Sequence, residues 1–481
     1  MNSGRPAELA VDEAVDLKGG TSRPDVTRAS WIALSILLLV YLLNNLDRFI
    51  LSILAQPIKE ELRLADWQLG LLTGFAFSLL YVVVGFPMAR LSDRGNRTLI
   101  LSLCVAFWSI MTALCGLATS FVQLCLFRAG VGVGEAACLP ASHSLISDLF
   151  PPEARTRAMS IFGLGLPLGG FAGVVIGGFV MDHWGWRSAM LIVGLPGLLV
   201  ALLTWMVIKE PERGRFERAS ARTLPSAGSL IEVAMALWKS PIARNVIIAL
   251  TAAGLVGAPN VTFMGPYMIR RFDLGYTELG VIIALTFMLG SAISTLGGGL
   301  IVHWASRFDD RWIMWVPAIG VALSAPLYVA AYAQSSWQGL AAILFLASVV
   351  NSTYLAPSYA MLHSTVGPNG RATASVIASF CLSLIAMGFG PLLAGMGIDL
   401  LAAHLFSVLE QGGFSSACPG GAAAAGSGPE LASACRSATS QATQWVIMGC
   451  LAAMVWPAWH FFLAARHMTI RTTSNAHHSR V

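Results

Sequence analysis

Twelve long apolar stretches dominate this 481-residue chain. A helix that crosses a membrane needs about 20 mostly apolar residues, and each stretch provides them. Charged residues make up only 11% of the sequence, whereas they make up about 25% of ordinary soluble domains. We therefore predict an all-α, polytopic membrane protein. Its twelve transmembrane helices are expected at 31–55, 68–90, 98–118, 121–147, 157–181, 187–208, 244–269, 277–302, 312–333, 338–363, 371–402 and 442–465.

A long polar gap at 209–241 divides the spans into two sets of six, which predicts two six-helix bundles joined by a cytosolic linker. A second gap, 403–441, is rich in Gly, Ala and Ser and is expected to form an extracytosolic loop. The remaining segments are a cytosolic N-terminal tail at 1–30, an N-terminal bundle at 31–208, a C-terminal bundle at 242–466 and a cytosolic C-terminal tail at 467–481.

The distribution of Lys and Arg over the loops predicts the orientation in the membrane. If the N-terminus lies in the cytosol, 22 of the 30 Lys and Arg residues fall on the cytosolic side and 6 on the opposite side. Loops with an excess of Lys and Arg stay in the cytosol. We therefore expect a multi-pass protein of the cell membrane, plasma or inner, with both termini cytosolic.

Two of the eight cysteines, Cys418 and Cys435, share the loop at 403–441, whereas the other six lie within apolar spans. On the extracytosolic side, an oxidising compartment favours a disulfide between them. Two unpaired loop cysteines are the alternative. No residue cluster has the spacing of a metal site, so we expect no metal and no cofactor.

Only four of the 55 charged side chains lie deep inside the apolar stretches: Asp47, Arg48, Arg128 and Glu135. A charge at the centre of a bilayer costs roughly 2.5–3.5 kcal/mol on insertion scales. Since a helix rises 1.5 Å per residue, Asp47 and Glu135 both fall near the membrane midplane. Such residues persist where they pair, face water or take part in function.

Two interpretations of these four residues remain open. They could form buried ion pairs that join the first and fourth spans, although desolvation can exceed the Coulomb gain of such pairs. They could instead form a proton relay or a site for a charged substrate. Burial favours the protonated form of a carboxylate and a nearby arginine favours the ionised form. An arginine that moves between two conformations would therefore make the carboxylate bind and release a proton. On this hypothesis Asp47 and Glu135 are the protonation pair, and Arg48 and Arg128 modulate them or bind an anionic group.

A loop with one acid among several arginines follows the second span, in GFPMARLSDRGNR at 85–97. Such a loop suits a cytosolic gate whose charges pair differently in two conformations. A simple positive-inside anchor is the alternative. The candidate gate residues are Gly85, Arg90, Asp93, Arg94, Arg97 and, after the fourth span, Arg155.

The sequence also contains a weak internal repeat. Residues 139–158, LPASHSLISDLFPPEARTRA, resemble residues 355–374, LAPSYAMLHSTVGPNGRATA, about half the chain away. Each segment ends one span and begins the next. Parallel repeats of this kind relate the two six-span halves of one large class of transporters.

The segment ARLSDRGNR at 89–97 resembles the signature loop between the second and third spans of the major facilitator superfamily. NNLDRF at 44–49 and RAGVGVGEA at 128–136 resemble the first and fourth spans of its spinster branch. This resemblance implies alternating access between two six-helix bundles. It also implies that Asp93 interacts with the N-terminus of the eleventh span and with Arg155 to close the cytosolic side.

Spinster-like proteins are associated with export of sphingolipids or lysophospholipids, so the resemblance implies an amphipathic substrate. Its charged head would find partners among the deep charges. Its tail would contact aromatic side chains of the C-terminal half, although such aromatics are more often packing or lipid-facing residues. The candidate substrate-binding residues are Asn44, Arg48, Arg128, Phe263 and Phe380.

We therefore expect a monomeric secondary active transporter, coupled to protons, whose partners are its substrate, protons and membrane lipids. The alternatives are a transporter of small organic anions or drugs, a membrane-embedded enzyme acting on lipids, and a non-transporting receptor. No nucleophile and base have catalytic spacing, which disfavours an enzyme. No basic stripe indicates a nucleic-acid partner.

Overall fold

A computed structural model describes residues 26–216, 230–409, 413–424 and 426–468, and these ranges contain helices and no strand. The predicted tails at 1–30 and 467–481 lie almost entirely outside the described residues, as does the middle of the predicted linker. The first half of the chain contains α1 (Arg28–Leu62), α2 (Asp66–Gly70), the π-helix η1 (Leu71–Phe75), α3 (Ala76–Arg94), α4 (Arg97–Cys115), α5 (Phe121–Glu135), α6 (Cys138–Leu149), α7 (Pro152–Gly163) and α8 (Gly165–Val207).

The second half begins with a helix in the predicted linker and continues through the second set of spans. Its elements are α9 (Leu230–Lys239), α10 (Pro241–Phe272), α11 (Tyr276–Ile283), η3 (Ala284–Leu289), α12 (Gly290–Ala305), α13 (Trp312–Tyr332), α14 (Trp337–Asn351), η4 (Ser352–Tyr354), α15 (Leu355–Phe380), η5 (Cys381–Phe389), α16 (Gly390–Leu409), α17 (Phe414–Ala417), η6 (Pro419–Gly421), α18 (Pro429–Ala452) and α19 (Val455–Arg466). α16 and α18 thus extend into both ends of the predicted loop at 403–441.

Eleven helical segments of the described chain are long and apolar enough to cross a membrane. One of them, Pro152–Val207, contains two predicted spans. α8 alone has 43 residues, so a straight helix would be about 64 Å long, roughly twice the hydrocarbon thickness of a bilayer. Gly185, with a φ of 77° that favours glycine, interrupts it. The twelve predicted spans are therefore accounted for.

The chain also reverses its direction within α15. The imidazole of His363 lies 2.6 Å from the hydroxyl of Ser375, and the hydroxyl of Tyr359 lies 3.3 Å from that of Ser379. In a straight helix, residues twelve apart would be separated by about 18 Å. The chain must therefore turn back between residues 363 and 375, as the predicted boundary between the tenth and eleventh spans requires.

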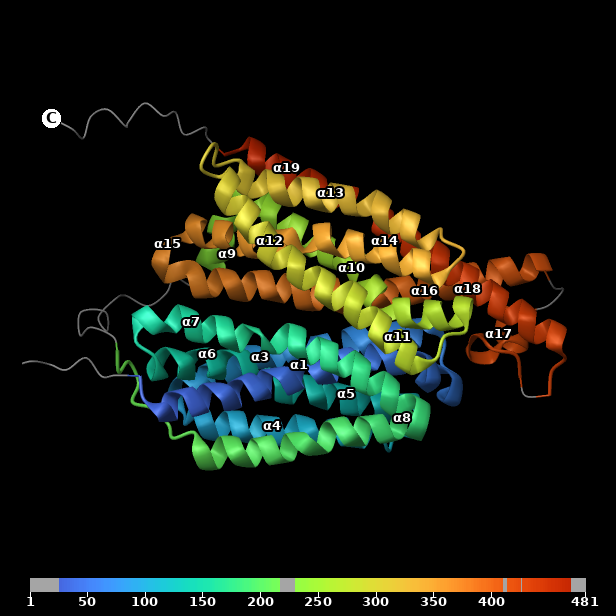
Figure 1. The fold of residues 1–481 in the computed structure, drawn as a ribbon, viewed down its shortest axis with the longest axis horizontal. Helices are drawn as coiled ribbons and strands as arrows, with labels where there is room; N and C mark the ends of the chain where they lie inside the picture. The colour runs from blue at the N-terminus through green and yellow to red at the C-terminus, as the bar shows by residue number, and fades with distance from the viewer. Residues whose placement is uncertain (1–25, 217–229, 410–412, 425, 469–481) are drawn as a thin grey trace, which may run out of the picture.

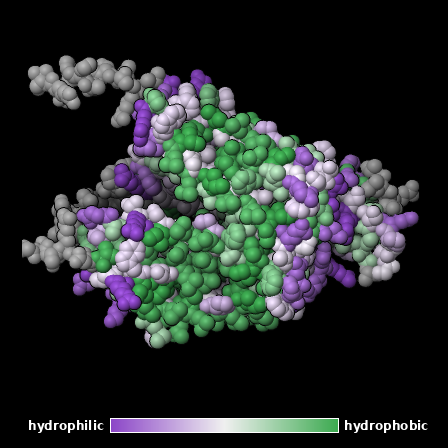
Figure 2. All heavy atoms as spheres, in the orientation of Figure 1, coloured by the Kyte–Doolittle hydropathy of each residue, from purple (hydrophilic) through white to green (hydrophobic). Residues whose placement is uncertain are grey.

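The helices form two bundles that lie side by side along their length (Figure 1). α1–α8 form the N-terminal bundle, and α10–α16 with α18 and α19 form the C-terminal bundle. We call the end where α1 begins and α19 finishes the terminal end, and the opposite end, which carries α17, the disulfide end. Figure 2 shows an apolar belt across both bundles and a hollow between them that opens toward the terminal end.

Close packing of α8 against α1 fixes the position of the deep charges. Glycines recur at every fourth position of α8, and a Cβ added to Gly169 or Gly173 would overlap the backbone of α1 at Leu42 or Leu46. Small residues let membrane helices approach backbone to backbone. The segment of α1 that follows Leu46 is thereby held in place in the N-terminal bundle.

Candidate functional site

The four deep charges meet at the centre of the N-terminal bundle. α1 carries Asp47 and Arg48, α5 carries Arg128, and Glu135 is the last residue of α5, before a turn that separates it from α6. Glycines of α5 allow this convergence. A Cβ at Gly132 would overlap the backbone of α3, and one at Gly134 would overlap that of α4.

The four residues form two acid–base pairs. Nε of Arg48 donates to Oε2 of Glu135 at 2.6 Å. Nη1 of Arg128 lies 3.7 Å from Oδ2 of Asp47, which also accepts a hydrogen bond from the hydroxyl of Thr112 at 2.8 Å. Each pair joins α1 to α5, and Thr112 adds α4. The structure therefore brings together all four residues of the predicted proton-coupling set.

Two aromatic rings of α3 cover the arginines. The guanidinium carbon of Arg48 lies 4.8 Å from the ring centroid of Phe77 and 4.7 Å from that of Tyr81, and Arg128 lies 5.4 Å from Phe77. Such cation–π contacts stabilise a guanidinium where water is scarce. The side chain of Arg48 is 30% exposed, whereas the other three charged side chains are at most 3% exposed. Arg48 is therefore the member of the set that an incoming molecule can reach.

Several buried polar atoms of the site lack a partner among the described residues. The atoms that make no hydrogen bond are Nδ2 of Asn44, Oδ1 of Asp47, Nε and Nη1 of Arg128, and Oε1 of Glu135, and of these Nη1 of Arg128 has only its longer ionic contact with Asp47. An unsatisfied buried donor or acceptor costs about 1–3 kcal/mol, and more where the group is charged. The site therefore has spare hydrogen-bonding capacity on both its acids and its bases, which a proton, a water molecule or a substrate could use.

Arg97, a predicted gate residue, is buried in the N-terminal bundle. Only 1% of its side chain is exposed, and it pairs with Asp148 at 2.5 Å and with Glu210 at 2.7 Å. Its Nη2 donates to the carbonyl of Pro211 at 3.1 Å. In this conformation these contacts attach the start of the linker to α4 and α6, and the role of Arg97 in a gate stays a prediction.

The other predicted gate residues lie at the terminal end. Arg90 stacks on Phe86 at 4.4 Å, and Nη2 of Arg155 donates to the carbonyl of Ser147 at 2.7 Å. Arg94 is exposed, and a Cβ added to Gly85 would meet open space. Asp93 lies in the last turn of α3, and its side chain is outside the described part of the structure. The contacts described for Arg90 and Arg155 stay within the N-terminal bundle, as expected where the terminal end is open.

The two predicted aromatic substrate contacts differ in accessibility. Phe263 is fully buried in the core around α10, so a substrate cannot touch it in this conformation. Phe380 is 44% exposed at the end of α15. Of this pair, only Phe380 is available to a molecule outside the core.

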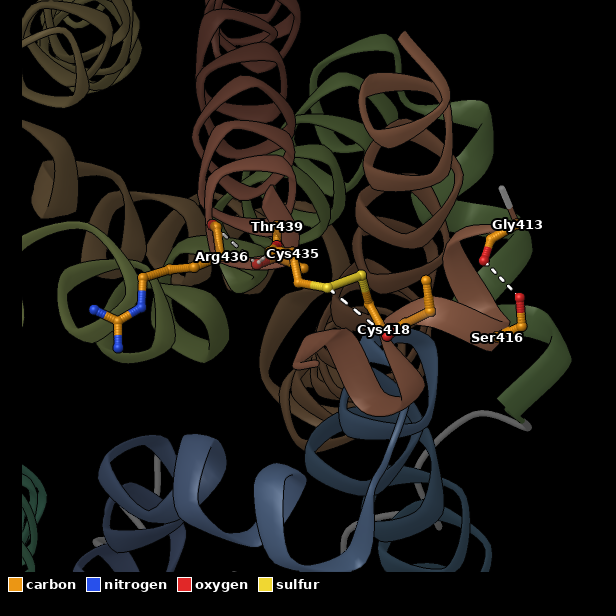
Figure 3. The surroundings of a disulfide bond; sticks show 7 residues. Gly413, Ser416, Cys418, Cys435, Arg436 and Thr439 are labelled. Atoms are coloured by element: carbon orange, nitrogen blue, oxygen red, sulfur yellow. Dashed lines mark hydrogen bonds between the residues drawn. A yellow bond between two sulfur atoms is a disulfide. The ribbon is translucent and has the colours of Figure 1, made fainter. Parts of the chain in front are cut away.

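Cys418 and Cys435 form a disulfide in the structure. Figure 3 shows it joining the segment after α17 to the first turns of α18, where Thr439 donates back to the carbonyl of Cys435 at 2.8 Å. The disulfide lies at the end opposite to the chain termini (Figure 1).

A second buried ionic cluster was missed by the sequence analysis. At the disulfide end, Asp66 pairs with Lys59 at 2.5 Å and with Arg270 at 2.7 Å, and all three side chains are at most 4% exposed. These residues stand at the edges of apolar stretches, where charges are ordinary. The one available signal was the position of Asp66 directly before a span, beside Lys59 and Arg63 in the preceding loop.

A family model for the Major Facilitator Superfamily matches residues 37–391. The chain belongs to the major facilitator superfamily. An MFS-type efflux pump of Mycolicibacterium smegmatis is 31% identical over 385 residues, which cover 79% of this chain and 86% of the pump. Protein spinster homolog 1 of Mus musculus is 29% identical over 430 residues, which cover 83% of this chain and 79% of that protein.

Among solved structures, the chain is similar to a bacterial homolog of the human lysosomal transporter spinster, in an inward-facing and unoccupied conformation. The TM-score is 0.82 and the sequence identity is 30%, over 92% of this chain and 98% of the homolog. This chain is therefore a spinster-like, multi-pass membrane member of a superfamily of transporters.

Proposed function

We propose that this protein is a proton-coupled secondary active transporter that moves an amphipathic, lipid-like substrate by alternating access. The substrate class is a sphingolipid or a lysophospholipid. The terminal end faces the cytosol, since 22 of the 30 Lys and Arg residues fall on that side and such loops stay in the cytosol. The hollow at the terminal end then makes the described conformation open to the cytosol.

The observation that carries the proposal is the pairing of Arg48 with Glu135. Glu135 is fully buried and pairs with the one partly exposed arginine of the site. A proton on Glu135 would remove the negative charge that holds Arg48, and the free guanidinium could then bind an anionic head group bidentately. Loss of the substrate would restore the pair and expel the proton. The proton on Glu135 and the substrate on Arg48 thus bind together and leave together.

Asp47 and Arg128 support the coupling of proton and substrate at Glu135 and Arg48. Oδ1 of Asp47 makes no hydrogen bond to the described residues, and Oδ2 is shared between Thr112 and a distant Arg128. Asp47 precedes Arg48 on the same helix, so a change in its charge alters the field at Arg48 directly. We assign Asp47 and Glu135 as the protonation pair, with Arg128 holding Asp47.

The choice of an amphipath follows from the uneven placement of charge. The deep charged residues belong to the N-terminal bundle, and the exposed Phe380 belongs to the C-terminal bundle. A molecule between the bundles would meet charge on one side and apolar surface on the other. The similarity to spinster proteins agrees with this choice.

The test is flux into proteoliposomes under an imposed pH gradient. The panel contains a lysophosphatidylglycerol, a phosphorylated sphingoid base, a sugar acid and a cationic drug. We expect gradient-driven flux of one of the two lipids, abolished by a protonophore. Flux of neither lipid, in protein that is folded and monodisperse, would overturn the substrate class.

A transporter of small organic anions or drugs is the second candidate. The Mycolicibacterium smegmatis relative is called an efflux pump, and a partly exposed arginine could bind any small anion. Gradient-driven flux of the sugar acid or the drug, without flux of either lipid, would favour this candidate.

A further inference from the structure

Two aspartates join the bundles at the disulfide end by capping helices of the opposite bundle. Asp399 of α16 accepts from the backbone N–H of Asp66 at 3.0 Å and from that of Trp67 at 2.8 Å, in the first turn of α2. Asp182 of α8 accepts from the backbone N–H of Tyr276 at 3.1 Å and from that of Thr277 at 2.8 Å, in the first turn of α11.

The two contacts are reciprocal. Asp399 reaches from the C-terminal bundle to the N-terminal one, and Asp182 reaches in the opposite direction. α8 and α16 contain the fifth and eleventh spans, and α2 and α11 begin the second and eighth. Each pair of elements therefore occupies corresponding places in the two halves. The same carboxylate-to-helix contact occurs twice, once in each direction.

Each cap lies beside a backbone-to-backbone contact made by glycine. A Cβ at Gly395 would overlap the backbone of Asp66, and one at Gly178 would overlap that of Tyr276. The capped helices also carry glycines that contact the backbone of the opposite bundle. A Cβ at Gly70 would overlap the carbonyl of Pro391, and one at Gly280 would overlap that of Val174. The bundles therefore meet without intervening side chains at both places.

A carboxylate suits this position for electrostatic reasons. The first N–H groups of a helix have no partner within the helix, and the positive end of the helix dipole attracts an anion. Each carboxylate accepts two of these N–H groups, and the hydroxyl of Thr277 adds a third bond to Asp182 at 2.6 Å. Separation of the bundles would break all of these bonds at once.

The contact at α2 is reinforced more than the contact at α11. Arg270 of the C-terminal bundle pairs with Asp66 and also donates to Gln56 of α1 at 2.9 Å. Tyr276 occupies the place in α11 that Asp66 has in α2. The disulfide-linked loop adds a further contact, because Gly421 lies against Lys59. The half-buried Asp399 thus lies in a stronger contact than the exposed Asp182.

We propose that Asp182 and Asp399 are paired latches that hold the disulfide end closed while the terminal end is open. Both must release before the disulfide end can open. This inference rests on the proposed alternating access, and it assigns the closing contacts of one side to two residues. The Asp182 latch opens more readily than the Asp399 latch, because only the latter lies beside a buried ionic cluster of the described residues.

The test measures the distance between spin labels on the two bundles at the disulfide end. The exposed Thr119, between α4 and α5, and the exposed Ser335, between α13 and α14, are changed to labelled cysteines. The native disulfide is kept. The free cysteines are replaced by serine or alanine at Cys104, Cys115, Cys125, Cys138, Cys381 and Cys450.

We expect Asp182→Asn and Asp399→Asn each to raise the ratio of long to short distances roughly threefold to tenfold, and the double variant to raise it further, because asparagine loses the charge and one acceptor. Asp273→Asn is the matched control. Asp273 is an exposed carboxylate at the same end that pairs with Arg436 inside its own bundle, and its change should leave the distances unaltered.

Unchanged distances in folded Asp182→Asn and Asp399→Asn protein would overturn the proposal. Should Asp399→Asn fail to fold, Asp182→Asn and Thr277→Val decide it, because they alter only the exposed latch. The measurement needs no substrate and no gradient. A failed flux assay with shifted distances would therefore reject the proposed function and keep the latches. Normal flux with unshifted distances would keep the proposed function and reject the latches.

Discussion

The two bundles share a helix interruption but place different chemistry at it. α5 and α14 each have 15 residues, and both end in a polar residue before a short break, Glu135 in α5 and Asn351 in α14. Two turns earlier stands Arg128 in α5 and Leu344 in α14, and both side chains are buried. The N-terminal bundle is therefore charged where the C-terminal bundle is neutral.

The C-terminal bundle makes neutral hydrogen bonds at Asn351 and at Asn260. The hydroxyl of Ser324 donates to Oδ1 of Asn351 at 3.2 Å, and that of Tyr332 donates to Oδ1 of Asn260 at 2.5 Å. A bundle of this architecture thus forms without deep charges at these positions. Since buried ion pairs are a poor source of stability, we infer that the charges of the N-terminal bundle are kept for transport.

The largest expected effect separates Glu135 from Asn351. Glu135→Gln should lower gradient-driven flux by at least about tenfold to a hundredfold, since the amide carries no proton and a hydrogen bond to a charged group contributes about 1.5–3 kcal/mol. Asn351→Ala should reduce flux less than about twofold, since it removes a neutral bond. Initial rates in proteoliposomes measure both. Equal losses in the two variants would remove the functional distinction between the bundles.

The next effect concerns folding. Arg128→Met leaves Asp47 buried without its partner and should lower the free energy of unfolding by about 3–5 kcal/mol. Leu344→Met, the matched change in α14, should lower it by less than about 1.5 kcal/mol. Denaturant titration in detergent measures both. A similar stability for the two variants would contradict the close coupling of Arg128 to Asp47.

A smaller effect is expected at Arg48. Arg48→Lys keeps the charge but loses the planar fork and its stacking on Phe77 and Tyr81, so the substrate should bind about tenfold more weakly. The maximal flux should change less than the apparent affinity. Flux measured against substrate concentration tests this. An unchanged affinity would indicate that the substrate does not contact the guanidinium.

The smallest effect tests the C-terminal side. Phe380→Ala should weaken substrate binding about threefold, as expected for a single aromatic contact. Val376→Ala, at a similarly exposed position of α15, should have no effect. Both variants are compared by flux against substrate concentration. An equal apparent affinity for substrate in the two variants would indicate that Phe380 contacts lipid alone.

The span pattern and the central site could be predicted from the sequence because both depend on local composition. Long apolar stretches specify membrane helices, and a charge within such a stretch is conspicuous by its cost. The pairing itself required the structure. Only the break after Glu135 and the glycine contacts of α5 and α8 show that α1 and α5 bring the four residues within reach of one another.

Other features escaped because they depend on contacts between distant segments. The pairing of Arg97 with Asp148 and Glu210 is one such contact. Phe263 looks like a candidate contact until its burial is known. Asp182 and Asp399 stand near span ends, where an acid is ordinary, and only the crossing of the two bundles gives them helix termini to cap.

The central claim is that Glu135 takes up a proton when Arg48 leaves it to bind the substrate. Proton uptake or release can be recorded in weakly buffered detergent solution when the transported amphipath is added to the protein. The account predicts proton uptake with the wild type and none with Glu135→Gln. Equal proton movement in the two proteins, or none in the wild type, would contradict it.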